Sequence, residues 1–207
     1  MLSFKTLLLL LLILWSIVYF LKDKIKKATH GKVEVQPLAA MIKYSEAEIL
    51  FQKIHSKLPF STKTLLVVGL PLLVFSIIWS SNLLIGGLLS ILYSLRHPAE
   101  GPAIPRVVPV IPGYTVPLSV SLIISIGVGI FIHELFHGIA CITGKIKIKS
   151  AGILFFLFFP GGFVEPDENS LEKSSLKDKV AMLLAGSISN LLLTLITIAI
   201  SLIMFHG

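Results

Sequence analysis

Long apolar runs, separated by polar and charged stretches, set the hydrophobic pattern of this chain. The first run covers residues 7–21, and the second, residues 65–95, carries no charged side chain. Two further runs cover residues 116–143 and 180–205. A helix of about 20 apolar residues crosses the hydrocarbon core of a bilayer. The pattern therefore predicts an all-α polytopic membrane protein with about four transmembrane helices.

The polar stretches divide the chain into three parts. Residues 1–21 are expected to form an N-terminal transmembrane helix, and residues 22–64 a cytoplasmic loop with one surface helix. Ser45 and Glu48 have the spacing of a capping box, which places the start of that helix. Residues 65–207 are expected to form a membrane-embedded core, with helices at about 67–95, 116–143 and 180–205.

Charge and composition agree with a membrane location. Only 14% of the residues are charged and 55% are hydrophobic, whereas a soluble domain is about a quarter charged. The net charge of +7 comes largely from lysines between Lys22 and Lys63, which lie beside membrane segments and have few aromatic neighbours. This arrangement favours contact with anionic membrane lipids over nucleic-acid binding. Cys141 is the only cysteine, which excludes an intrachain disulfide and a cysteine-rich metal site.

Basic residues also predict how the helices are oriented. The positive-inside rule places the lysine-rich loop and the basic residues 144–149 in the cytoplasm. Residues 96–115, rich in proline and glycine, then form an extracytoplasmic loop. The following helix is expected to begin around Pro117, and Gly69 and Pro71 are expected to make the preceding helix irregular.

Residues 150–164 interrupt the helical pattern. Within them, residues 153–159 are apolar on both faces and rich in phenylalanine, and Pro160-Gly161-Gly162 follows as a turn signal. The run is too short to span a membrane as a helix. We interpret it as a small membrane-embedded re-entrant β segment, with a short buried helix as the alternative.

A His-Glu-x-x-His sequence lies within the apolar run of residues 116–143. His133 and His137 are four residues apart and therefore share one face of a helix, where they can bind one metal ion. Glu134 lies about 100° further round the helix and can reach a water on that ion. Because His and Glu are costly inside a bilayer, the cluster favours a functional site over a structural salt-bridged one. The spacing predicts a zinc hydrolase with Glu134 as general base.

Asn190 is a polar residue inside the last apolar run. Counted along a helix from residue 180, it lies roughly 15 Å deep, which is about the depth expected for His133 from the same side. A polar side chain at membrane depth is a candidate for a functional site. Packing between helices is the alternative, because Asn, Ser and Gly are common at such interfaces.

These residues and their neighbours resemble the site-2 protease family, the intramembrane zinc metalloproteases. The similarity covers about residues 105–205, the catalytic-core part only, and is greatest to the branch of the eukaryotic sterol-pathway enzyme and its archaeal relatives. The matching motifs are His133-Glu134-x-x-His137-Gly138, Pro160-Gly161-Gly162-Phe163-Val164 and Ala185-Gly186-x-x-x-Asn190.

The resemblance implies roles for several residues. Zinc would be bound by His133 and His137, and Glu134 would be the catalytic base. A membrane-embedded strand near residues 155–159 would pair with an unwound segment of the substrate. Asn190 would hold the substrate or the oxyanion.

One feature departs from the family pattern. The family takes its third zinc ligand from an aspartate in a Leu-Asp-Gly motif on a later helix, and this sequence contains no such motif. Glu165, Asp167 and Asp178 are expected in a loop and do not match that aspartate. The chain is therefore expected to be a fragment of a longer protease, a truncated homologue, or a protein that completes its site otherwise.

The sequence supports one main functional hypothesis and one rival. The main hypothesis is an intramembrane zinc metalloendopeptidase, which cleaves transmembrane segments of membrane proteins at a site nearer the cytoplasmic side. The rival is a non-catalytic site-2-like membrane scaffold or regulator that lacks the third zinc ligand. Both place the protein in the membrane as a multi-pass protein. The sequence leaves the identity of the substrate and the oligomeric state open.

Overall fold

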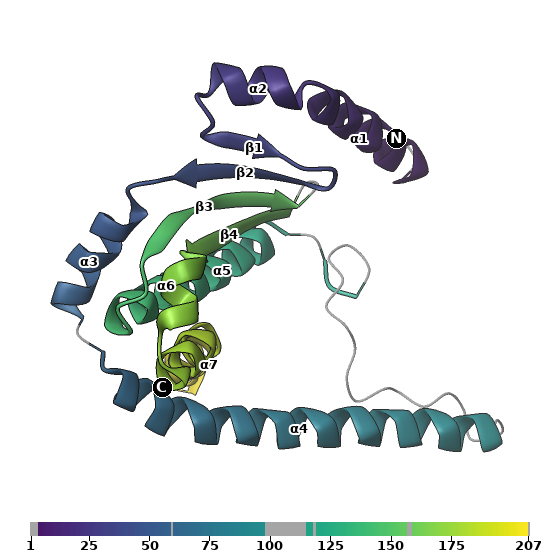
Figure 1. Ribbon diagram of the computed structural model, residues 1–207. Coiled ribbons are helices and arrows are strands. Elements are labelled where there is room, and N and C mark those ends of the chain that lie inside the picture. Colours follow the sequence, from purple (N-terminus) through teal and green to yellow (C-terminus); the bar gives the residue numbers. More distant parts are fainter. Residues whose placement is uncertain (1–3, 59, 98–114, 118, 157–158, 207) are drawn as a thin grey trace.

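The structure is a computed structural model that describes residues 4–58, 60–97, 115–117, 119–156 and 159–206. Residues 4–57 contain three helices and two strands: α1 (Phe4–Phe20), α2 (Lys22–Ala28), β1 (Val33–Val35), β2 (Ala39–Tyr44) and α3 (Ala47–Lys57). The remainder contains α4 (Thr62–Arg96), α5 (Val120–Thr143), β3 (Ile148–Phe156), β4 (Phe159–Pro166), α6 (Glu168–Lys173) and α7 (Leu176–His206). The described chain is thus mostly helical, with one small sheet (Figure 1).

Three helices of the described chain are long and apolar enough to cross a membrane: α4, α5 and α7. They correspond to three of the four spans expected from the sequence. The helix α1 has 17 residues, which is short for a span of about 20, so a fourth transmembrane helix stays a prediction.

The three long helices meet at one end. Thr62 at the start of α4 donates a hydrogen bond to Asp178 at the start of α7, with 2.7 Å between Oγ1 and Oδ1. Thr143 at the end of α5 donates to the carbonyl oxygen of Phe60 at 3.2 Å. The orientations expected from the basic residues place these same three helix ends on one side of the membrane. The structure agrees with that relative arrangement.

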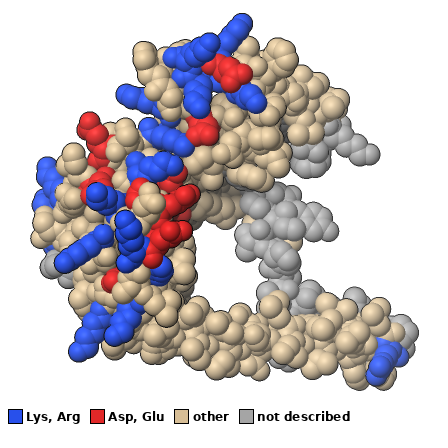
Figure 2. Space-filling model, in the orientation of Figure 1, with Lys and Arg blue, Asp and Glu red and all other residues tan. Residues whose placement is uncertain are grey.

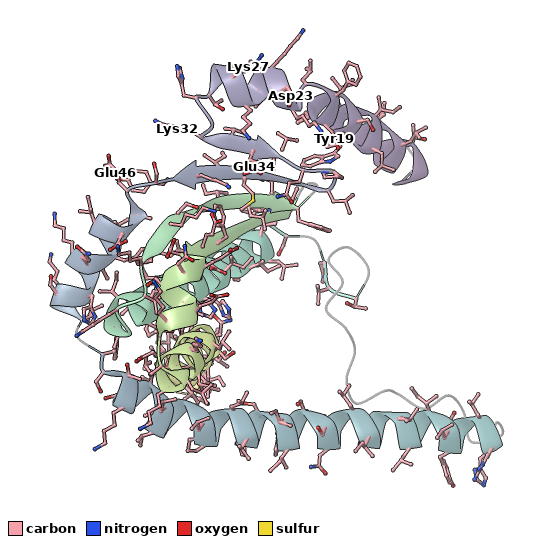
Figure 3. All side chains as sticks on the ribbon, in the orientation of Figure 1. Tyr19, Asp23, Lys27, Lys32, Glu34 and Glu46 are labelled. Atoms are coloured by element: carbon pink, nitrogen blue, oxygen red, sulfur yellow. The ribbon has the colours of Figure 1, made fainter. Side chains whose placement is uncertain are left out.

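Charged side chains gather around this end of the molecule. Figure 2 shows them over α2, the sheet, α3, α6 and the first turns of α4, whereas the length of α4 beyond is uncharged as far as its last turn. In Figure 3, Asp23, Lys27 and Lys32 lie on and after α2, on the side of the sheet away from α5 and α7. This distribution is that of a protein with one charged, water-facing end and apolar helices beyond it.

The sheet has four antiparallel strands in the order β1-β2-β3-β4. The β segment expected at residues 150–164 is therefore present as the β3–β4 hairpin, and the short-helix alternative is wrong. The sequence did not predict β1 and β2, which lie in the expected loop. Because Phe155 pairs with Ala40 on one side and Pro160 on the other, β3 is a central strand. The edge strand next to β3 is β4. Residues 155–156, which the resemblance implied would pair with a substrate, have strand partners on both sides in this sheet. Residues 157–158 lie outside the described chain.

Two helices begin differently from what the sequence pattern predicted. The capping box at Ser45 is absent, because Glu48 instead accepts from the backbone N–H of Ile148 at 3.2 Å and from Gln52. The helix expected from Pro117 begins at Val120, where Ser119 accepts a hydrogen bond from the N–H of Leu122.

The helix α4 continues through Pro71 as one helix of 35 residues, so the irregularity expected at Gly69 and Pro71 does not divide it. Gly69 has a packing role in that helix. A Cβ atom there would collide with Ile188, so the missing side chain lets α7 approach α4 closely.

The helix α5 is at the centre of the fold. One side packs on α7 through a cluster that includes Ala140, Ala185 and Ile188. Another side packs on α3 and the sheet through Phe51 and Ile139. A Cβ atom at Gly138 would collide with the ring of Phe51, so this glycine lets α3 lie directly against α5.

Candidate metal centre

His133 and His137 lie one turn apart on α5, with both side chains directed at α7. Their Nε2 atoms are 3.0 Å apart, and the two rings meet edge to face at an angle of 78°. Both residues are half-buried. The spacing of four residues therefore brings the two imidazoles together as the helical period requires.

The other ring nitrogens are held by α7. His137 Nδ1 donates to the backbone carbonyl of Met182 at 2.7 Å, which leaves a lone pair on Nε2 of the neutral ring. His133 Nδ1 lies 3.1 Å from the side-chain amide nitrogen of Asn190. The side-chain amide of Asn190 can either donate a hydrogen bond to His133 Nδ1 or accept one from it, because a rotation of 180° exchanges the amide nitrogen and oxygen. Such outer partners fix the ring orientation of metal-binding histidines.

Gly186 on α7 lies directly in front of the two Nε2 atoms. A Cβ atom at this position would lie 2.5 Å from Nε2 of His133 and 2.5 Å from Nε2 of His137. A zinc ion lies about 2.0–2.1 Å from a histidine nitrogen, and two such nitrogens on a tetrahedral ion are roughly 3.3 Å apart. The 3.0 Å separation of the nitrogens is therefore close to that of two histidine ligands on one zinc ion, and the missing side chain at Gly186 lets α7 pack directly against both rings.

Carboxylate side chains near the sheet are engaged elsewhere. Glu165, which lies in β4 and not in a loop, accepts from Lys149 Nζ and from Ser150 Oγ, each at 2.6 Å. These hydrogen bonds, with Lys149 the larger cause, hold the pKa of Glu165 below its usual 4.5. Asp167 caps α6 by accepting from the N–H of Ser170.

Asp178 is also engaged, because it accepts from Thr62 and Ser175. Within the described ranges, no group of three His, Cys, Asp or Glu side chains is placed to hold a metal ion.

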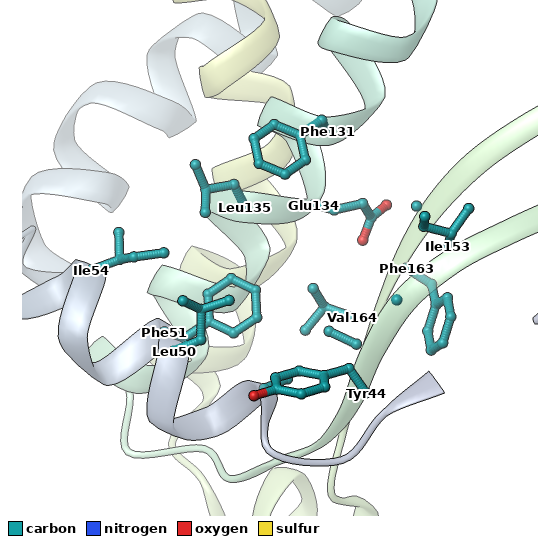
Figure 4. A pocket seen from close by; sticks show the side chains of 14 residues that line it. Tyr44, Leu50, Phe51, Ile54, Phe131, Glu134, Leu135, Ile153, Phe163 and Val164 are labelled. Atoms are coloured by element: carbon teal, nitrogen blue, oxygen red, sulfur yellow. The ribbon is translucent and has the colours of Figure 1, made fainter. Parts of the chain in front are cut away.

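Glu134 faces away from α7, toward the sheet. Gly162 of β4 packs against it, since a Cβ atom on Gly162 would lie 2.9 Å from Glu134 Cγ. The carboxylate of Glu134 borders a cavity of about 350 Å³ between α5, α3 and the sheet (Figure 4). Neighbouring residues of the motif thus face two different environments.

Two features of the site were not predicted from the sequence. Gly186 was noted only as part of a motif, although a small residue is the ordinary signal for close helix packing in membranes. The cavity wall from α3 depends on tertiary packing, and the sequence carries no local signal for it.

Comparison with known proteins agrees with the resemblance found in the motifs. The sequence model of Peptidase family M50, the site-2 protease family, matches residues 121–206. An uncharacterized protein of Methanocaldococcus jannaschii is 30% identical in an alignment that covers 94% of this chain and 50% of that protein. The chain therefore spans about half the length of this relative. No solved structure matches the chain.

Proposed function

From the match of residues 121–206 to peptidase family M50, we propose that this chain carries the catalytic residues of an intramembrane zinc metalloprotease. The observation that carries the proposal is the convergence of His133 Nε2 and His137 Nε2, which are 3.0 Å apart on one face of α5. The substrates would be membrane proteins cut within a transmembrane segment. The support for this class is that the two histidines lie on α5 and face α7, two helices that are long and apolar enough to cross a membrane.

His133 and His137 would hold the zinc ion through their Nε2 atoms. The Met182 carbonyl keeps the proton of His137 on Nδ1, so that Nε2 is free to bind. When bound, zinc would polarise the peptide carbonyl and lower the pKa of water. Catalytic zinc sites take three protein ligands, so a third ligand in addition to the histidine pair is part of the proposal.

Asn190 would position His133. With its amide rotated so that the oxygen faces the ring, Asn190 would accept a hydrogen bond from His133 Nδ1–H and leave the lone pair on Nε2 for zinc. This role differs from the contact with substrate or oxyanion implied by the family resemblance. Its support is the 3.1 Å distance between the amide nitrogen and His133 Nδ1.

Glu134 would act as general base. It would take a proton from the attacking water and deliver it to the amine that leaves when the peptide bond breaks. Glu134 borders the cavity where substrate has room, while the histidines remain on the α7 side. The active site would lie nearer the cytoplasmic side, since His133 is roughly 15 Å from the basic end of α5 at Thr143.

The test is to purify the chain in detergent, measure zinc per protein, and measure cleavage of a single-span reporter protein. We expect bound zinc and cleavage, and we expect Glu134→Gln to keep the zinc while it slows cleavage by about 10²- to 10⁴-fold.

Each of the other outcomes has a meaning. Zinc without cleavage would favour the non-catalytic scaffold. Absence of zinc, or cleavage that Glu134→Gln leaves unchanged, would overturn the proposed mechanism.

A further inference from the structure

The cavity beside Glu134 is lined almost wholly by apolar side chains. Its volume is about 350 Å³, at the lower end of the range of pockets that bind small molecules. Glu134 carries the only charge among the residues that line it. Phe131 and Leu135 line it from α5, and Ile153, Phe163 and Val164 line it from the sheet (Figure 4).

The position of Glu134 relates this cavity to the bond that would be cut. A general base acts within hydrogen-bond reach of the proton that it takes, directly or through one water. A peptide bond placed for attack therefore lies close to Glu134, and the side chain beside that bond lies next to the cavity. The cavity continues toward a smaller one of about 220 Å³ along Gly127, Ile130 and Pro160, which leaves room for adjacent substrate residues.

The remaining wall comes from α3, upstream of the residues that match the peptidase family. Leu50, Phe51 and Ile54 of α3 line the cavity, together with Tyr44 at the end of β2. Phe51 fixes the helix against Gly138, and Glu48 binds the N–H of Ile148. The size of the cavity thus depends on a helix that the sheet and α5 hold in place.

We propose that this cavity binds a large apolar side chain, such as Leu or Phe, from the substrate residue next to the cleaved bond, and that α3 sets its size. The inference rests on the proposed protease function. A charged or strongly polar side chain would lose its hydration there without gaining a partner. An apolar side chain would move from water or lipid into contact with the apolar walls of the cavity. Each methylene group that fits, or fails to fit, is expected to change kcat/KM by about 10- to 200-fold.

Leu50 is the residue best placed to test the cavity. It lines the cavity while about half of it is exposed (49%), so a substitution there spares the buried core. Ile49, its neighbour on α3, is 66% exposed and does not line the cavity, which makes Ile49→Trp the matched control.

The first experiment measures kcat/KM on single-span reporters that differ only at the residue next to the cleaved bond. The wild-type chain is expected to prefer Leu or Phe over Ala or Asp by at least about 10-fold. Leu50→Trp is expected to lower kcat/KM for the Leu and Phe reporters by at least about 10-fold and so to remove that preference. Leu50→Ala is expected to enlarge the cavity and to raise kcat/KM for a reporter with Trp at that position. An unaltered preference in both variants, or a change equal to that of Ile49→Trp, would overturn the proposal.

The second experiment does not depend on turnover. The Glu134→Gln chain is mixed with reporters that carry benzoyl-phenylalanine at successive positions of the span, and crosslinks are mapped by mass spectrometry. One position is expected to crosslink to Leu50 or Ile54, and Leu50→Trp is expected to abolish that crosslink. Absence of any crosslink to α3 overturns the cavity proposal even if the chain cleaves. A crosslink without any cleavage by the wild-type chain supports the cavity and counts against the proposed function alone.

Discussion

His133 and His137 face α7, where a carbonyl, an amide and a glycine determine how their rings lie. Glu134, the residue after His133, faces the sheet and an apolar cavity instead. The first environment holds two side chains in one orientation. The second leaves space beside a carboxylate. The comparison indicates that one face of α5 fixes the metal-binding pair while the adjoining face leaves room beside the general base, so that changes on the two faces are expected to have different consequences.

The largest effect is expected from Gly186→Ala, on the metal-binding side. The new methyl group would lie 2.5 Å from both Nε2 atoms, so the two rings would have to leave their present arrangement. Zinc affinity is expected to fall by more than about 100-fold, which exceeds the loss expected when only a hydrogen-bond partner of a metal-binding histidine is removed. The rate of cleavage is expected to fall as well. Equilibrium dialysis with zinc analysis measures this loss. The control is Gly129→Ala on α5, because a Cβ atom there meets nothing within 4 Å. Equal zinc binding in the two variants would contradict the proposed zinc position.

The next effect is expected from Phe51→Ala, on the other side of α5. Phe51 is 6% exposed and packs against Gly138, so truncation would lower the free energy of unfolding by about 3–5 kcal/mol. Thermal unfolding measures the loss, and the zinc content of the folded fraction is expected to stay unchanged. A simultaneous loss of zinc under folding conditions would show that the two sides of α5 are not separate.

A smaller effect is expected from Asn190→Ala. Loss of the partner of His133 Nδ1 is expected to weaken zinc binding by about 10- to 100-fold. Asn190→Asp is expected to restore zinc affinity, because a carboxylate accepts a hydrogen bond from His133 Nδ1–H. Thr197→Ala, further along α7, removes a hydroxyl that bonds only to the Leu193 carbonyl among the interactions of the described chain, and it is the control. Failure of Asp to restore binding would argue against a positioning role.

The smallest effect concerns the charged residues of the sheet. Since Lys149 and Ser150 hold the pKa of Glu165 below 4.5, their contribution to stability is present above that pH and is lost as the pH falls through the lowered pKa. The contribution of this pair is expected to be small, because the Lys149 and Glu165 side chains both reach solvent. Unfolding of the wild-type chain and Glu165→Gln, compared from pH 7 to pH 3, measures it. A difference that grows as the pH falls would contradict the assignment.

The apolar pattern was sufficient to predict the long helices but not the sheet. The runs that became α4, α5 and α7 carry their signal locally, because each is long and nearly free of charge. The strand β1 has only three residues, and β2 reads Ala-Ala-Met-Ile-Lys-Tyr, with little alternation. These two segments are strands because β3 pairs with β2, and no local pattern records a partner so distant in sequence.

The site divides in the same way. The helical spacing predicts that His133 and His137 lie together, as they do. The equal depth expected for Asn190 and His133 agrees with the 3.1 Å distance between their side chains. The close packing of Gly186 on the two rings and the cavity beside Glu134 arise where separate elements meet. Such features depend on how closely helices and strands approach, which residue types along one segment do not determine.

The pairing of β2 with β3 has a consequence for the biosynthesis of the protein. Ala39 pairs with Phe156, so the partner strand emerges from the ribosome only after α4 and α5 have been made. At about 5–20 residues per second, the outer edge of β2 stays without its neighbour for roughly 5–25 s. An unpaired strand edge is a template for association with other chains. Insertion of two long helices into the membrane must therefore keep pace with translation, or nascent chains with an open β2 edge will accumulate and aggregate.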